Sequence, residues 1–210
     1  MSTHASVWTR EEIEAAFRHY FLTGPVHEDW VAWSQLFADD AWYLDHFYGT
    51  FHGPVEIQRF LESTMSFAPH VYSPLVWYNI DGSQVVYKVV NRADNPEPGK
   101  PPVEFPSLQI INYAGDGRWA SEEDWWIKAE MKRFNEQYEA AAREHDPDHK
   151  TKMTRLDWGD WVDWARPEPA HDASPSWSGR DDVPRVTNIR DVDFGERNDT
   201  EPTSSSPEMT

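Results

Sequence analysis

A series of four strand-like segments between residues 75 and 126 constrains the fold of this chain more than any other feature. The segments contain valine, isoleucine and aromatic residues between turn-forming residues, and they cover residues 75–80, 85–91, 105–113 and 119–126. Asp81-Gly82 and Gly115-Asp116-Gly117 supply glycines where tight hairpin turns need a positive φ. The pattern predicts a sheet of neighbouring antiparallel strands.

A helix is predicted before these strands. Thr9 and Glu12 have the spacing of a capping box, in which each residue satisfies backbone groups at the start of a helix. The apolar residues that follow recur at helical spacing to about Leu22, and Gly24-Pro25 is expected to end the helix there.

A second helix, a strand and a third helix follow. Asp29 is a good N-cap for a short helix whose apolar side contains Trp30, Trp33 and Phe37. The aromatic-rich segment from Ala41 to Tyr48 predicts a strand. Gly53-Pro54 begins the third helix, since proline is favoured at the first helical position.

The composition changes after a last helix that is predicted to end near Glu144. From residue 146 the chain is rich in Pro, Asp, Ser and Arg, and it cannot bury enough apolar surface for a core of its own. We expect one domain over residues 1–145 and an acidic, extended tail over residues 146–210, disordered after about residue 196. Asp-Trp pairs at 157–158, 160–161 and 163–164 indicate either a disordered acidic stretch or a segment that docks on the domain or on a neighbouring subunit.

The net charge of -18 argues against nucleic acid as a partner, because phosphate contacts need clustered Lys and Arg, and against an anionic membrane surface. The chain has no cysteine, no signal-like start and no apolar run long enough to span a bilayer. We therefore expect a soluble, cytoplasmic protein.

No cofactor or metal is expected. The chain lacks a glycine-rich phosphate loop, a Gly-x-Ser-x-Gly elbow and a dinucleotide fingerprint. His145 and His149 flank ligand-type residues, but they lie in a segment broken by Pro147, which disfavours a metal site.

The order helix, helix, strand, helix and four strands is an α+β pattern. The stretch from Leu36 to Asp45, followed by Gly49, Gly53 and Ile57, resembles the nuclear transport factor two-like superfamily, and within it the SnoaL-like enzymes and ketosteroid isomerases. The resemblance covers about residues 9–140. It implies a cone-like half barrel of curved antiparallel sheet, covered by three N-terminal helices and followed by a C-terminal helix and the tail. It also implies a hydrophobic pocket and a homodimer, or a higher homo-oligomer, through the sheet face.

The resemblance to ketosteroid isomerases suggests three site residues. Asp45 lies where those enzymes carry the general-base aspartate, and Tyr20 lies where they carry the tyrosine that donates to the developing oxyanion. Where they have a protonated aspartate, this chain has Gln109, which can donate a hydrogen bond but is not an acid.

A second set of residues resembles limonene-type epoxide hydrolases and SnoaL-type cyclases. Asp124, ahead of two tryptophans, lies where these enzymes place a catalytic aspartate on the last strand. Tyr43-Leu44-Asp45 resembles the hydrolases' Tyr-x-Asn. Their Arg-x-Asp is matched either by Arg92-Ala93-Asp94 or, after aligning the hairpin, by Val89 and Asn91.

Buried carboxyl groups inside an apolar cone have raised pKa values, and two in one pocket divide into an acid and a base. We assign these roles to Asp45 and Asp124, with Tyr20 and Gln109 as oxygen-binding donors. Side-chain alternation puts Tyr43 on the same face as Asp45, and Glu122 and Trp126 on the same face as Asp124. The expected substrate-binding residues are Tyr43, His46, Trp77, Tyr87, Asn91 and Trp126, and for several of them a core or surface position is the alternative.

The leading hypothesis is a cofactor-independent isomerase, dehydratase or hydratase, or cyclase. Its substrate would be a hydrophobic, oxygenated small molecule such as a steroid, terpenoid or polyketide intermediate. The alternatives are a non-catalytic small-molecule-binding or dimerisation module and a limonene-type epoxide hydrolase.

Overall fold

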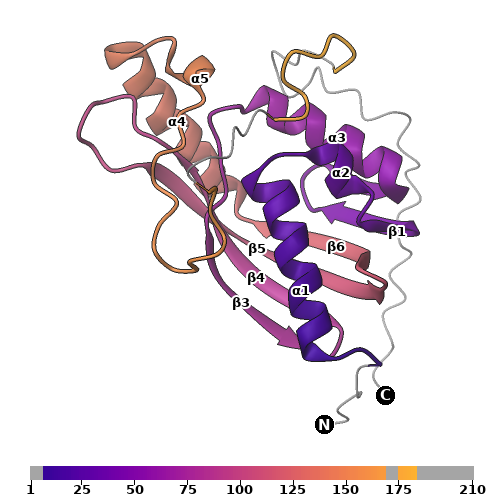
Figure 1. The fold of residues 1–210 in the computed structure, drawn as a ribbon. Helices are drawn as coiled ribbons and strands as arrows, with labels where there is room; N and C mark the ends of the chain where they lie inside the picture. The colour runs from indigo at the N-terminus through magenta and orange to yellow at the C-terminus, as the bar shows by residue number, and fades with distance from the viewer. Residues whose placement is uncertain (1–6, 169–174, 184–210) are drawn as a thin grey trace, which may run out of the picture.

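The computed structural model describes residues 7–168 and 175–183, and its centre is a curved, six-stranded sheet in the order β2-β1-β6-β5-β4-β3 (Figure 1). Helices α1 (Arg10–Phe21), α2 (Trp30–Ser34) and α3 (Gly53–Phe67) lie on one face of this sheet (Figure 1). Helix α4 (Lys128–His145) follows the last strand. This is the predicted α+β cone.

The four strands predicted between residues 75 and 126 are confirmed as β3 (Leu75–Asp81), β4 (Gln84–Ala93), β5 (Val103–Gly115) and β6 (Arg118–Trp126). The strand predicted before them begins earlier, as β1 (Phe37–Asp45), so Phe37 belongs to the sheet and not to the second helix. A short strand that was not predicted, β2 (Gly49–His52), pairs with the end of β1.

One strand pairing differs from the predicted antiparallel sheet: β1 and β6 run parallel. No hairpin joins these two strands, so turn geometry does not constrain their relative direction. The parallel register sets Tyr43 beside Glu122 and Asp45 beside Asp124. Residues that are about 80 positions apart in the sequence therefore meet in the middle of the sheet.

The start of α1 follows the predicted capping, with the Thr9 side chain accepting from the Glu12 backbone N–H at 3.1 Å. Gly24-Pro25 does not end the helical path, however, which widens into the π-helical turn η1 (Leu22–Val26). The backbone N–H of His27 reaches Leu22 O at 3.0 Å, five residues back, a spacing that bypasses the N–H that proline lacks.

The tail turns back over the domain after a short helix, α5 (His149–Lys152). Trp158 packs on Tyr72 with ring centroids 5.1 Å apart, and Trp164 meets Phe17 at 5.9 Å. The guanidinium of Arg92 lies over the ring of Trp161, with its central carbon 5.2 Å from the ring centroid. The three Asp-Trp pairs therefore dock on the domain of their own chain. The predicted disorder after residue 196 concerns residues outside the described part of the structure.

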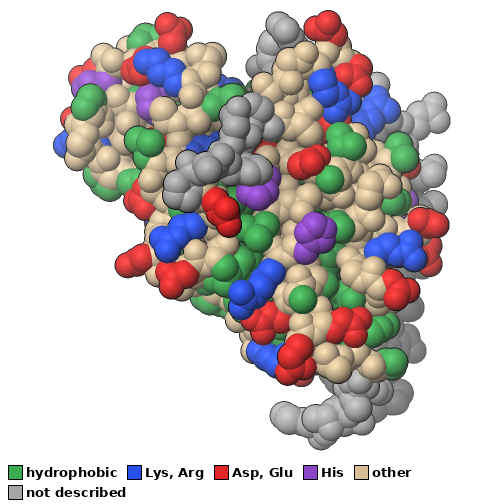
Figure 2. Space-filling model, viewed as in Figure 1, with side chains coloured by type: hydrophobic (Ala, Val, Ile, Leu, Met, Phe, Trp, Pro, Cys, Tyr) green, Lys and Arg blue, Asp and Glu red, His purple; other side chains and the backbone are tan. Residues whose placement is uncertain are grey.

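The surface seen in Figure 2 carries Lys and Arg side chains interspersed with Asp and Glu, and the basic residues do not gather into a patch on this face. Within the described ranges, none of the helices has the length and apolar composition needed to cross a membrane.

Candidate active site

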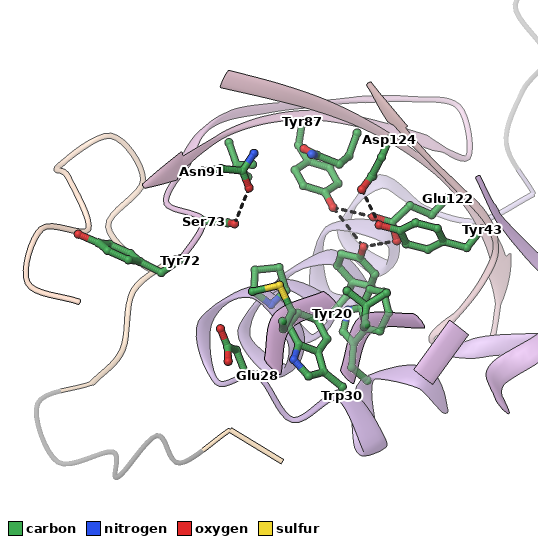
Figure 3. Close-up of a pocket in the computed structure, with 16 residues that line it drawn as sticks. Tyr20, Glu28, Trp30, Tyr43, Tyr72, Ser73, Tyr87, Asn91, Glu122 and Asp124 are labelled. Carbon is green, nitrogen blue, oxygen red and sulfur yellow. Dashed lines mark hydrogen bonds between the residues drawn. The ribbon is translucent and has the colours of Figure 1, made fainter. Parts of the chain in front are cut away.

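A cavity of about 120 Å³ lies between the inner face of the sheet and the helices. Its walls include aromatic side chains from α1, α2 and the strands, and acidic side chains from β6 (Figure 3). Aromatic walls with a few convergent polar groups are typical of small-molecule sites.

Glu122 and Asp124 are the polar centre of this cavity. They alternate along β6, so both side chains enter the same side of the sheet. Tyr20 donates to Glu122 Oε2 at 2.5 Å and Tyr87 donates to Glu122 Oε1 at 3.1 Å. Tyr43 donates to Asp124 Oδ2 at 2.5 Å (Figure 3). Three tyrosines thus hold two neighbouring carboxyl groups.

Burial controls the protonation of this pair. Loss of hydration raises the pKa of Glu122 to about 7, although its hydrogen bonds from Tyr20 and Tyr87 oppose the shift. The pKa of Asp124 is raised well above its ordinary value by burial first and then by the charge of Glu122. Because two like charges in one buried site repel each other, ionisation of one carboxyl group disfavours ionisation of the other.

Two buried oxygens of the cavity wall come from neighbouring residues. Gln109 and Asp124 are directly opposite each other in the β5–β6 register. Gln109 Oε1 and Asp124 Oδ1 are both buried and have no hydrogen-bond partner among the described residues. The amide of Gln109 is held by Ser107 at 2.7 Å, in a polar row that continues through Asn91 to Ser73. A buried polar atom without a partner is costly, so this pair is suited to a polar group on a bound molecule.

The cavity brings together six of the residues predicted as site residues: Tyr20, Tyr43, Tyr87, Asn91, Gln109 and Asp124. They come from α1 and four different strands, so only the folded sheet places them in one wall.

Asp45, predicted as the general base, does not line this cavity. Its Oδ1 accepts the backbone N–H groups of Phe47 and Tyr48 at 2.7 and 2.9 Å, and its Oδ2 accepts from Trp126 Nε1 at 3.1 Å. Burial raises the pKa of Asp45 while these hydrogen bonds oppose the rise. The carboxylate is therefore occupied in holding the turn between β1 and β2.

Three predicted substrate-binding residues also lie outside the cavity wall. His46 stacks on Trp125 and binds Glu123 at 2.8 Å, and its side chain is partly exposed. Trp77 is 42% exposed, and Trp126 is occupied by its hydrogen bond to Asp45. For His46 and Trp77 the reason is strand alternation, which turns them to the opposite face of the sheet.

Arg92, the candidate for the hydrolases' arginine, faces the tail and not the cavity. It pairs with Glu104 at 2.6 Å and with Asp157 at 3.0 Å. Asn91 lines the cavity in its place, as the alternative alignment of the hairpin indicated.

Glu122 and Glu28 were not predicted as site residues, yet both line the cavity. For Glu122 the signal was present, because it shares a strand face with Asp124, but the run Glu122-Glu123-Asp124 is also typical of a wet surface. For Glu28 the sequence offers no signal, since its partner, Arg155, is 127 positions away.

Within residues 7–168 and 175–183, no three His, Asp or Glu side chains are grouped so that they could hold a metal ion. The polar groups that line the cavity include carboxyl, phenol and amide groups.

Comparison with known proteins agrees with this architecture. Residues 17–122 match the model of the SnoaL-like domain family. An epoxide hydrolase from M. tuberculosis is 18% identical, with a TM-score of 0.50 over 64% of this chain and 96% of its own. A SnoaL-like protein from Shewanella putrefaciens, assigned as a polyketide cyclase, is 17% identical, with a TM-score of 0.50 over 59% of this chain and 85% of its own. At such identities these structures share the fold and nothing more specific. No curated protein sequence matches the chain significantly.

Proposed function

The chain belongs to the SnoaL-like domain family, and we propose that it is a cofactor-independent enzyme that acts by general acid–base chemistry on a small, hydrophobic, oxygenated molecule. One observation carries this proposal: Glu122, which is fully buried, and Asp124, which is partly buried, lie on the same face of β6 and are held by three tyrosines inside an aromatic cavity. A base that titrates near neutrality beside an acid that keeps its proton is what proton transfer at neutral pH requires.

Glu122 is the proposed base and Asp124 the proposed acid. Because Asp124 Oδ2 accepts from Tyr43, the proton of Asp124 is free to lie on Oδ1, the oxygen without a partner. A substrate carbonyl would accept this proton, or a hydrogen bond from it. Gln109 Oε1 would accept a hydrogen bond from a hydroxyl group of the same molecule. An α- or β-hydroxy ketone has both groups.

In the proposed step, Glu122 removes a proton from the carbon next to the carbonyl. The C–H electron pair forms the C=C bond of an enol, and the carbonyl oxygen takes the proton of Asp124. Return of a proton to another carbon isomerises the substrate. In a dehydration, the β-hydroxyl takes the proton from Glu122 and leaves as water while the enol O–H proton returns to Asp124. In a ring closure, the enol carbon attacks a second carbonyl, whose oxygen takes the proton from Glu122 while the enol O–H proton returns to Asp124. Donors placed at the developing oxyanion typically contribute about 3 kcal/mol each.

Two other functions have less support. A non-catalytic binding module would need no pair of ionisable groups deep in its pocket, since burying them without a role costs stability. An epoxide hydrolase of the limonene type would need an arginine between two inward carboxylates, and Arg92 is engaged with Glu104 and Asp157.

The proposal is tested by hydrogen exchange on a ketone with a single ring. Cyclohexanone deuterated at both α-carbons is incubated with the protein in ordinary water at pH 7.5, and loss of deuterium is followed by mass spectrometry. The wild-type protein is expected to accelerate the loss over buffer. Glu122→Gln and Asp124→Asn are expected to reduce the acceleration at least about 100-fold, the usual scale of general acid–base catalysis.

Glu123→Gln is the matched control, because Glu123 lies between the two acids but faces His46 on the opposite side of the sheet. It should keep the wild-type rate. An acceleration that survives in Glu122→Gln, or no acceleration by the wild-type protein, would contradict the proposed chemistry.

A further inference from the structure

At one end of the cavity, two residues of its wall contact the tail. Glu28 and Tyr72 line it at the end away from Glu122 and Asp124, next to the returning tail (Figure 3). Glu28 forms an ion pair with Arg155 at 2.7 Å, and the two side chains are only 1% and 12% exposed. Tyr72 accepts the backbone N–H of Asp157 at 3.2 Å. We call residues 155–158 the strap.

The strap is fixed at several further points. The backbone N–H of Leu156 donates to Asp94 Oδ2 at 3.0 Å, and Arg155 also donates to Pro69 O at 3.2 Å. Trp158 covers the ring of Tyr72. The strap is thus part of the structure around the cavity, although it lies beyond residues 17–122, which match the family model.

Glu28 is held in an unfavourable position. Its φ of 52° is rare for a residue other than glycine, and the charged partner of its buried carboxylate is Arg155. A buried carboxylate is kept in such a place only when its partner remains, so Glu28 and Arg155 depend on each other. The backbone around Glu28 is further held by Ser176, whose N–H donates to Glu28 O at 3.0 Å.

The size of the cavity suggests what the ion pair between Glu28 and Arg155 does for ligand binding. A cavity of about 150 Å³ holds one benzene ring, whereas sites for drug-sized ligands are about 300–1,000 Å³. The cavity here, at about 120 Å³, is close to the first of these sizes and well below the second.

We propose that Arg155, through its ion pair with Glu28, determines substrate size: it holds the strap against Tyr72 and thereby excludes molecules larger than a single ring. The tail is therefore a specificity element of the site, and the Arg155 side chain acts by position, without contacting the reacting atoms. The inference uses the cavity described above but not the acid–base chemistry proposed for it.

The test compares two ketones that differ by one ring, cyclohexanone and 2-decalone, by isothermal titration calorimetry. The main variant combines Glu28→Gln with Arg155→Ala, so that neither charge remains buried alone. Arg180→Met is the matched control: it removes another ion pair between the tail and the domain, with Glu62 at 2.5 Å, which does not line the cavity. Circular dichroism confirms that each variant is folded.

The wild-type protein and Arg180→Met are expected to bind cyclohexanone more tightly than 2-decalone. In the double variant the ratio of the affinity for 2-decalone to the affinity for cyclohexanone should rise at least 10-fold. The same preference in all three proteins, a shift in Arg180→Met as well, or binding of neither ketone would overturn the proposal. Because binding needs no turnover, a failed exchange assay would leave this result standing.

Discussion

Tyr20 of α1 donates a hydrogen bond of 2.5 Å to Glu122 of β6, across 102 positions of the sequence. Both side chains are fully buried, and the same tyrosine lies 3.1 Å from the hydroxyl of Tyr87. The first helix and the last strand of the domain are therefore joined through the group proposed as the base. The bond favours the ionised form of Glu122 and so limits how far burial raises its pKa.

Replacing Tyr20 by Phe is expected to raise the pKa of Glu122 further, because the donor that stabilises its charged form is lost. The midpoint of the pH–rate profile for deuterium exchange should move up by about 1 pH unit, and the free energy of unfolding should fall by about 1–2 kcal/mol. Tyr78→Phe, which removes a hydrogen bond to Glu14 at the surface, is the control and should leave the profile in place. If the midpoint of the pH–rate profile does not move in Tyr20→Phe, then the group that titrates in the profile is not one that Tyr20 stabilises.

The stability of the fold should fall as the pH rises. The pKa of Glu122 is raised from 4.5 to about 7 on folding, so between these pH values the folded state binds more protons than the unfolded state. The stabilisation is fully present below about pH 4.5 and is lost as the pH passes 7. Glu122→Gln should reduce the difference in unfolding free energy between pH 5 and pH 8 by on the order of 2 kcal/mol. Urea denaturation at the two pH values measures this, with Glu123→Gln as the unchanged reference. An equal pH dependence in both variants would argue against the raised pKa.

The substitution Asp45→Asn tests whether the role of Asp45 is structural or catalytic. The amide of asparagine cannot accept both the two backbone N–H groups and Trp126 Nε1, so the unfolding free energy should fall by about 1–2 kcal/mol. The rate of deuterium exchange should stay within about 3-fold of wild type, since general-base losses are typically 100-fold or more. A 100-fold loss of rate at unchanged stability would instead restore Asp45 as the base.

The docking of the tail can be measured at Trp164. Its ring packs between Phe17, Phe21 and Tyr78, and Trp164→Ala should lower the unfolding free energy by about 2 kcal/mol. Trp161→Ala, at a ring that is 44% exposed, should cost less than about 1 kcal/mol. Equal effects of the two substitutions would mean that the tail does not dock as described.

Self-association through the outer face of the sheet stays a prediction. Leu108 and Trp125 are directly opposite each other in the β5–β6 register and are 40% and 48% exposed, which gives this face an apolar centre. If two copies pair there, Trp125→Glu should shift sedimentation towards the monomer. Val55→Glu on α3, at a residue that is 79% exposed, should not. A wild-type protein that sediments as a monomer would exclude this interface.

Much of the fold could be predicted because its signals are local. Alternating strands joined by glycine turns, the Thr9 cap and the proline that opens α3 each determine a few neighbouring residues. The parallel pairing of β1 with β6 could not be predicted in this way, because it depends on two segments that no short turn connects.

The site was predicted in part for the same reason. Tyr20, Gln109 and Asp124 were identified by position within a resemblance, and the structure places them in one cavity. Asp45 is buried as well, but one of its oxygens is bound by neighbouring backbone groups and the other by Trp126, which the sequence does not reveal. Glu28 could not be predicted as a site residue, because its ion pair with Arg155 forms only when the tail folds back over the domain.

The pairing of β1 with β6 also bears on how the protein is made. During synthesis, β1 leaves the ribosome about 80 residues before the strand it pairs with, so its inner edge must wait without a partner until residue 126 has been translated. Contacts of such long range are the slow steps of folding. Strand β6 brings the proposed base, Glu122, and the proposed acid, Asp124, into the sheet together, so a chain that stops before residue 126 has neither a finished sheet nor this pair of carboxyl groups.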